Sequence, residues 1–82
     1  MYKLVPIRGI PGQKEFILKE GKNVIGRTEE SDIYLDSEFI SKRHALITIT
    51  GSEMVIEDLK SRNGTFVNGI MVQPATLKLG DR

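Results

Sequence analysis

Two short runs of alternating apolar and polar residues meet at the dipeptide Gly51-Ser52, and this pattern restricts the fold more than any other part of the chain. A period of two is typical of a strand with one face buried and the other exposed. A dipeptide that begins with glycine suits the two-residue turn of a β-hairpin. The sequence therefore predicts a hairpin over residues 44–58 whose buried face carries Ala45, Ile47, Ile49, Met54 and Ile56.

The rest of the chain continues in the same way. Short runs rich in β-branched and aromatic residues are separated by turn signals such as Pro11-Gly12, Gly21 and Gly80. No segment shows the period of an amphipathic helix, and frequent turns between short strands favour a β-sandwich or a small barrel. We expect an all-β, two-sheet sandwich of mainly antiparallel strands over residues 2–7, 15–18, 23–25, 33–35, 44–50, 53–58, 65–67, 71–72 and 76–79.

The C-terminal segment predicts an open edge. Leu77 and Leu79 read as a strand, and Gly80-Asp81-Arg82 reads as a turn after which no strand follows. A sandwich that stops there leaves one strand edge unpaired. We therefore interpret residues 1–82 as a single domain, either truncated at its C-terminal edge or part of a larger protein. A neighbouring molecule that supplies the closing strand, by homodimerisation or strand exchange, is the other possibility.

Length and composition exclude several classes of protein. A chain of 82 residues buries only about 60–65% of its unfolded surface, which leaves no room for an enclosed catalytic cavity and counts against an enzyme. Twelve basic and eleven acidic residues lack the basic excess of most nucleic-acid-binding proteins. Without cysteine and with one histidine, disulfides and thiolate or multi-histidine metal sites are excluded, so we expect no metal and no cofactor. No apolar stretch approaches a membrane span and no secretory signal opens the chain, so the expected location is the cytoplasm.

The conspicuous polar residues fall in the predicted loops. The hairpin over residues 44–58 brings its two ends together, so loops 41–43 and 60–63 should emerge at the same end of the sandwich. Arginine offers a planar fork for two phosphate oxygens, and serine offers a hydroxyl donor. Asparagine can donate to and accept from a peptide backbone. This combination suits a phosphorylated peptide better than a sugar or a base edge.

Taken in order, these motifs resemble the forkhead-associated (FHA) domain family, a β-sandwich of the FHA/SMAD-like kind whose loops read phosphothreonine. The resemblance extends over most of the chain, and its ordered spacing is more specific than any single motif. The matching residues are Ile25-Gly26-Arg27, Ser31-Asp32-Ile33-Tyr34-Leu35, Ile40-Ser41-Lys42-Arg43-His44, Asp58, Ser61-Arg62-Asn63-Gly64-Thr65-Phe66-Val67-Asn68-Gly69, Leu77, Gly80 and Asp81.

The resemblance implies a role for each loop residue. Arg27 and Ser41 would bind the phosphate, and Asn63 would hold the peptide backbone. Lys42 stands where many members have asparagine and Arg62 where some have threonine, so their contacts with the phosphate are additional expectations. The residues expected to support the pocket are Gly26, His44, Gly64, Asn68 and Gly69, of which the last two also read as a hairpin turn.

Phe39 is a candidate specificity residue. It lies two positions before Ser41, where the family's loop can approach the side chain three residues after the phosphothreonine. An aromatic ring at this place would favour an apolar residue of the ligand and would give an acidic residue no partner.

The sequence thus predicts a non-catalytic phosphothreonine-peptide-binding module that mediates phosphorylation-dependent protein–protein interaction in signalling. The main alternative is a sandwich that assembles or dimerises through its open sheet edge without phosphate. Nucleic-acid binding is disfavoured because only five aromatic residues are present and they form no stacking row. A small hydrolase built on Ser41 and His44 lacks an identifiable third carboxylate and an oxyanion donor.

Overall fold

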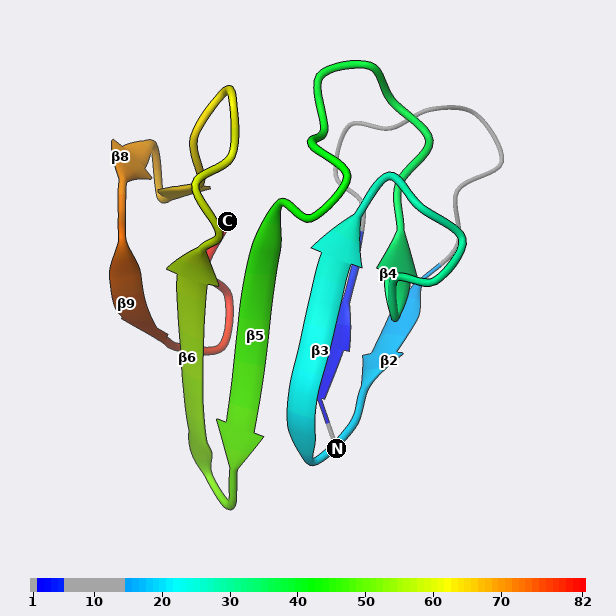
Figure 1. The fold of residues 1–82 in the computed structure, drawn as a ribbon. Helices are drawn as coiled ribbons and strands as arrows, with labels where there is room; N and C mark the ends of the chain where they lie inside the picture. The colour runs from blue at the N-terminus through cyan, green and yellow to red at the C-terminus, as the bar shows by residue number, and fades with distance from the viewer. Residues whose placement is uncertain (1, 6–14) are drawn as a thin grey trace.

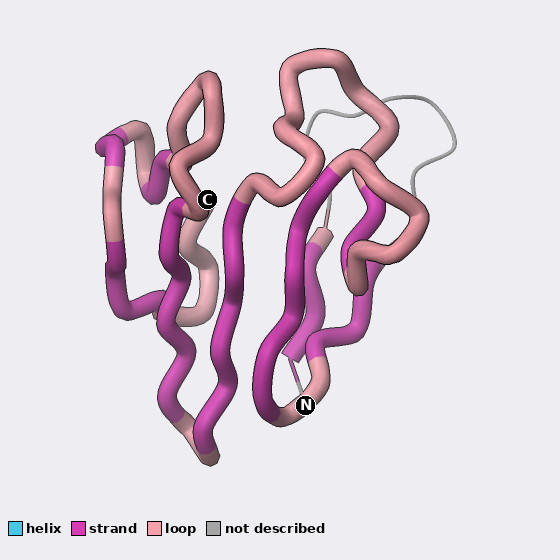
Figure 2. Tube along the Cα trace, in the orientation of Figure 1, coloured by secondary structure: helices cyan, strands magenta, loops and turns pink. Residues whose placement is uncertain are grey.

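The computed structural model describes residues 2–5 and 15–82, and within these it contains nine strands and no helix (Figures 1 and 2). The predicted all-β fold with mainly antiparallel pairing is confirmed, since five of the six strand pairs described are antiparallel. Of the predicted strand 2–7, residues 6 and 7 lie outside the described part. The strands are β1 (Tyr2–Leu4), β2 (Phe16–Leu18), β3 (Gly21–Gly26), β4 (Ile33–Tyr34), β5 (Ala45–Thr50), β6 (Glu53–Asp58), β7 (Phe66–Val67), β8 (Ile70–Met71) and β9 (Pro74–Leu77).

A five-stranded sheet in the order β4-β3-β5-β6-β9 forms the larger layer. Its centre is the β5–β6 hairpin, in which Thr50 pairs with Glu53 across the predicted two-residue turn. Gly51 adopts φ of 60° at the first turn position, a conformation that glycine enters without steric cost. The alternation in the sequence therefore sets both the position and the register of this hairpin.

One face of this sheet carries the apolar core. Cross-strand neighbours on it form rows, such as Ile47 beside Ile56 and Ile49 beside Met54, with β9 adding Leu77 next to Met54. Ile47 is only 1% exposed. The core also receives side chains from the small β1–β2 and β7–β8 sheets, which supply part of the second layer; its buried members are Leu18, Ile25, Ile33, Ala45, Ile47, Ile49, Met54 and Ile56.

The second layer leaves an apolar hollow of about 250 Å3 open over this core. It lies between β1, the β7 strand and the segment that follows β9, and Leu79 at its margin is 81% exposed. Its apolar lining comes from Tyr2, Leu4, Leu18, Ile25, Ile47, Met54, Ile56, Phe66, Val67, Leu77 and Leu79.

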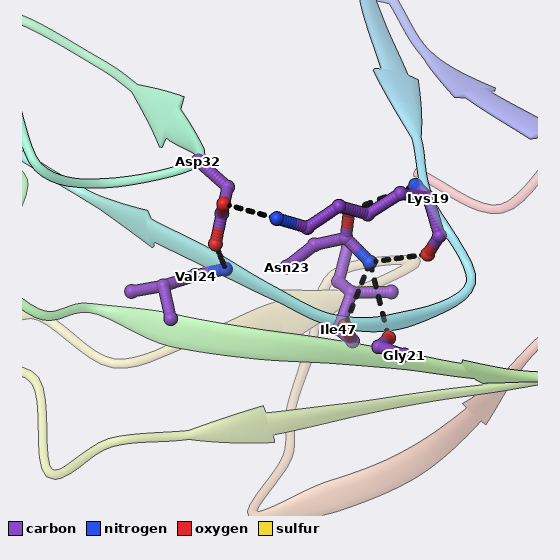
Figure 3. A network of polar contacts seen from close by, with 6 residues as sticks. All are labelled: Lys19, Gly21, Asn23, Val24, Asp32 and Ile47. Carbon is purple, nitrogen blue, oxygen red and sulfur yellow. Dashed lines mark hydrogen bonds and ion pairs between the residues drawn. The ribbon is translucent and has the colours of Figure 1, made fainter.

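A buried amide interrupts the apolar face of β3 and fixes the turn before it. Asn23 is 2% exposed, and its Oδ1 accepts a hydrogen bond from the Lys19 backbone N–H at 2.9 Å. Its Nδ2 donates to the carbonyls of Lys19, Gly21 and Ile47 (Figure 3). Since all its polar atoms are partnered, the amide avoids the cost of a buried unsatisfied group and ties the β2–β3 turn to β5.

A carboxylate performs a similar function at the outer edge of β3. There β4 pairs with β3 in parallel, beginning at Ile25 opposite Ile33. One residue earlier, the Val24 N–H has no strand partner on this side and donates instead to Asp32 Oδ2 at 2.8 Å, while Lys19 Nζ lies 2.7 Å from Oδ1 (Figure 3). These bonds, that from Lys19 foremost, hold the pKa of Asp32 below its ordinary value. They also fix the return of loop 27–32, which begins with Arg27.

Candidate functional site

The loops at one end of the five-stranded sheet enclose a polar hollow. In Figure 1 the loops after β3 and β6 and the loop before β5 lie together at that end. The hollow has a volume of about 390 Å3, and an adjoining space of about 340 Å3 extends it toward Ser41. The expectation that loops 41–43 and 60–63 emerge at the same end is confirmed. The polar hollow is lined by Arg27, Glu38, Phe39, Ile40, Ser41, Lys42, Arg62 and Asn63.

Ser41 is held on three sides by hydrogen bonds. Its N–H donates to His44 Nδ1 at 3.0 Å, and its carbonyl accepts from the Arg27 N–H at 3.1 Å. Its Oγ accepts from the Arg62 N–H at 2.9 Å. Because that bond uses only a lone pair of the oxygen, the hydroxyl proton remains available for an acceptor in the polar hollow.

The backbone under Arg27 requires a glycine at the preceding position. A Cβ on Gly26 would lie 2.1 Å from the Lys42 carbonyl oxygen and 2.6 Å from Ser31 Oγ. The close approach exists because the Arg27 N–H also donates to this Lys42 carbonyl, at 3.2 Å. Gly26 therefore lets the two loops meet, and Arg27 leaves the end of β3 with its side chain along the polar hollow.

His44 connects the two loops that border the polar hollow from β5 and β6. The ring is 7% exposed, and its Nδ1 accepts from the Ser41 N–H. Its Nε2 lies 2.8 Å from the Gly64 carbonyl, which can only accept, so the neutral ring carries its proton on Nε2. Both ring nitrogens are thereby bonded to backbone groups, which is a positioning arrangement. No ring nitrogen is left to take a proton from Ser41 Oγ, as the hydrolase alternative would need.

Asp58 organises the loop that carries Arg62 and Asn63, a role that sequence reasoning did not assign to it. Its Oδ2 accepts from the Ser61 N–H at 3.1 Å, and its Oδ1 accepts from the hydroxyls of Ser61 and Thr65. Partial burial raises the pKa of Asp58, but the hydrogen bonds from Ser61 and Thr65 outweigh it and leave the pKa below its ordinary value. Its place at the end of the predicted hairpin, three residues before Ser61, was the available signal.

Asn63 and Phe39 meet across the mouth of the polar hollow. Asn63 Nδ2 donates to the Phe39 carbonyl at 2.7 Å, which leaves Oδ1 and one N–H of the amide for a ligand backbone. The Phe39 ring is 69% exposed. The structure thus brings the predicted backbone-binding and specificity residues into direct contact.

The electrostatics of the polar hollow are dominated by cations. Arg27, Lys42 and Arg62 line it, whereas Glu38 supplies the acidic side chain of the lining. Arg43, the other basic residue of the loop before β5, borders a separate small cleft with Val24 and Ser31. Three cations around one hollow and a free hydroxyl donor are suited to a doubly charged phosphate group.

The predicted pocket-supporting residues fall into two groups. Gly26 and His44 join the loops that border the polar hollow, and the Gly64 carbonyl bonds the His44 ring. Asn68 and Gly69 lie apart from it, in the β7–β8 turn, with φ of 52° and 81°. Asn68 Nδ2 there donates to Asp81 Oδ1 at 3.1 Å. Support of the pocket by these two residues stays a prediction.

Two further observations concern ions and membranes. Within residues 2–5 and 15–82, no three His, Asp or Glu side chains gather as a metal ion would require. Over the same part of the chain, the structure contains no helix of the length and apolarity needed to cross a bilayer.

Comparison with protein families decides the relationship: the FHA domain profile matches residues 23–82. The chain belongs to the FHA domain family. That match covers every residue lining the polar hollow, together with Gly26, His44 and Asp58.

Curated relatives of this FHA chain include bacterial regulators. The chain is 40% identical over 78 residues to the glycogen accumulation regulator GarA of Mycolicibacterium smegmatis, covering 95% of this chain and 49% of that protein. It is 37% identical over 78 residues to the oxoglutarate dehydrogenase inhibitor of Corynebacterium glutamicum, covering 95% and 54%. The chain therefore spans about half the length of these relatives.

Solved FHA structures share the fold. One, from a structural and functional analysis of phosphothreonine-dependent FHA domain interactions, has a TM-score of 0.82 and 37% identity, covering 87% of this chain and 74% of that one. Mycobacterium tuberculosis EmbR in complex with a low-affinity phosphopeptide has a TM-score of 0.80 and 38% identity, covering 88% and 19%. The predicted FHA resemblance and fold class are confirmed.

Proposed function

We propose that this FHA domain binds threonine-phosphorylated peptides and thereby mediates phosphorylation-dependent protein–protein interaction in signalling. The observation that carries the proposal is the geometry of Ser41, whose three hydrogen bonds leave its hydroxyl proton free to donate to a group in the hollow lined by Arg27, Lys42 and Arg62. Donors fixed in advance lose little conformational entropy when an anion binds. The phosphopeptide in the EmbR complex and the phosphothreonine-dependent FHA structure agree with this chemistry.

In this mechanism the phosphate lies against Arg27 and Ser41. The guanidinium donates to two phosphate oxygens and the hydroxyl to a third. Lys42 and Arg62 add positive charge, and the free groups of the Asn63 amide pair with the peptide backbone beside the phosphorylated residue. Two or three charge-assisted hydrogen bonds of about 1.5–3 kcal/mol each suffice for a strong preference over the unphosphorylated peptide.

The role is binding and not catalysis, which agrees with relatives named as a regulator and as an inhibitor. The proposal includes a cytoplasmic location, where the kinase that phosphorylates the partner would also act. The proposal also includes a preference for phosphothreonine over phosphoserine. As the family resemblance implies, the methyl group of the threonine would pack in a small apolar niche.

The test is a titration of a phosphothreonine peptide library, with phosphoserine and unphosphorylated peptides of the same sequences, followed by isothermal titration calorimetry on the best binder. Wild-type protein should bind the phosphothreonine peptide with micromolar Kd, and S41A should weaken this binding at least tenfold. R43A removes a charge from the same loop outside the polar hollow and should stay within about twofold of wild type. Equal affinity for phosphorylated and unphosphorylated peptides would refute the proposal.

A second candidate, phosphate-independent assembly, is favoured by one feature, the apolar hollow beside the edge strand β9. A second copy of the chain would pair with β9 and cover Leu77 and Leu79. Size-exclusion chromatography with light scattering, over a range of concentrations, separates this alternative from a monomeric binding module.

A further inference from the structure

An acidic side chain lies in the wall of the otherwise basic polar hollow. Glu38 lines both the main space and its extension toward Ser41, together with Arg27 and Arg62. A carboxylate beside a phosphate site repels the phosphate and weakens its binding. The negative charge of Glu38 should therefore be balanced by a cationic group, either of the protein or of the ligand.

The protein itself does not neutralise Glu38. Among the described residues, ion pairs join Lys3 to Glu15 and Lys19 to Asp32, and none includes Glu38. Its side chain is exposed although two arginines line the same space. The carboxylate is thus available to a group on the ligand.

The backbone presents Glu38 from a fixed turn. The Ile40 N–H donates to the Ser37 carbonyl at 3.0 Å, and the Phe39 N–H donates to Ser37 Oγ at 3.3 Å. Asn63 ties the same turn to the opposite loop through the Phe39 carbonyl. The backbone at Glu38 is accordingly held in place relative to Ser41 and Asn63, the residues that would bind the phosphate and the peptide backbone.

The neighbouring ring supplies the apolar half of a subsite. Phe39 is exposed and lines the hollow beside Glu38. Lysine and arginine carry an apolar stem that packs on such a ring and a cationic head that a carboxylate attracts. Phe39, Glu38 and Ser41 line one space of about 340 Å3, so a side chain bound at Phe39 belongs to a residue close to the phosphothreonine along an extended peptide.

We propose that Glu38 and Phe39 form a subsite for a lysine or arginine of the ligand, within three residues of the phosphothreonine. The stem lies on Phe39 and the head pairs with Glu38. This inference rests on the proposed function and sharpens the expectation for Phe39, since the ring then favours a long apolar stem whose end is basic.

The test uses one phosphothreonine peptide in which each position within three residues of the phosphate carries in turn lysine, norleucine or glutamate. Norleucine keeps a linear apolar stem and lacks the charge. At one position, wild-type protein should bind the lysine peptide roughly threefold to fivefold more tightly than the norleucine peptide, and E38Q should bring this ratio to about one. D36N removes a charge from the same loop outside the polar hollow and should preserve the wild-type ratio.

The outcomes separate this inference from the proposed function. Binding of the norleucine peptide that depends on its phosphate supports the function by itself. If that binding occurs and the ratio is the same in wild type and E38Q at every position, the basic subsite is refuted and the function stands. If D36N lowers the ratio as much as E38Q, the preference comes from the general charge of the loop and the subsite is also refuted. If no peptide binds, both proposals fail.

Discussion

The two hollows of this FHA domain differ in the chemical groups that their walls offer to a ligand. The polar hollow is built from loops, yet Ser41, Asn63 and His44 are each fixed by hydrogen bonds that cross from one loop to another. The segment after β9 that borders the apolar hollow is also tied down, because Asn68 of the β7–β8 turn bonds both Asp81 and Arg82, but Leu79 itself remains exposed and the lining is mainly apolar. The comparison teaches that a site built from loops can be preorganised, and that three cations around the free hydroxyl of Ser41 distinguish the polar hollow from the apolar one.

The largest effect should come from Arg27. R27A removes two charge-assisted hydrogen bonds to the phosphate, so Kd for the phosphothreonine peptide should rise about 100-fold to 1,000-fold. Calorimetry on wild type, R27A and the matched R43A measures this. A change below about threefold in R27A would mean that the phosphate does not bind in the polar hollow.

The next largest effect concerns the glycine beneath that arginine. G26A places a Cβ against the Lys42 carbonyl, which belongs to the backbone and cannot swing away. The free energy of unfolding should fall by about 3 kcal/mol, the upper part of the range for overpacked sites, as measured by urea denaturation. Wild-type stability in G26A would show that the two loops separate without cost and that the hollow is not preorganised.

A smaller loss is expected at Asp58. D58N leaves one acceptor oxygen for the three donors of Ser61 and Thr65, so the free energy of unfolding should fall by about 1–2 kcal/mol. The loop that carries Asn63 should loosen, and peptide Kd should rise about threefold to tenfold. D36N, an exposed aspartate outside the network, is the matched control and should change neither quantity. Unaltered peptide affinity in D58N would show that this network does not position the site.

The hydrogen-bonded carboxylates of Asp32 and Asp58 predict that acid destabilises the fold. The folded-state pKa values of Asp32 and Asp58 are lowered, so their contribution is present above the ordinary aspartate pKa of about 3.9 and is lost as pH falls through the lower folded values. Unfolding free energy should be flat from pH 7 to 5 and fall below pH 4. The fall should be shallower in D58N, and identical slopes in D58N and wild type would contradict the assignment.

The smallest effect should come from the apolar hollow. L79S changes a side chain that is mostly exposed, so monomer stability and phosphopeptide affinity should stay within about 0.5 kcal/mol of wild type. If the wild type dimerises through this margin, L79S should instead shift the elution of the protein toward the monomer.

The sequence allowed prediction of the features that depend on local pattern. The hairpin 44–58, its two-residue turn and the meeting of loops 41–43 and 60–63 followed from alternation and chain connectivity. The parallel pairing of β4 with β3 did not, because Asp32 and Val24 meet through a tertiary contact that no periodicity encodes. The buried Asn23 was missed for the same reason, since its polarity is compensated by carbonyls from other segments.

The residues of the candidate site can likewise be separated into those that the sequence indicated and those that only the structure revealed. The ordered motifs of the FHA resemblance singled out Arg27 and Ser41, which lie in loops next to predicted strands. The role of Glu38 emerged only when loops separated in sequence were placed side by side, whereas that of Asp58 depends on the conformation of the loop that directly follows it. Which hydrogen-bonding groups of Ser41 and Asn63 remain free is likewise a property of the assembled loops.

The most direct test is a 1H–15N NMR titration of the wild-type chain with a phosphothreonine peptide and with its unphosphorylated form. The account predicts phosphate-dependent shifts concentrated at the amides of Arg27, Ser41, Arg62 and Asn63, with little change at Leu77 and Leu79. Shifts confined to β9 and the apolar hollow, and equal for both peptides, would contradict it.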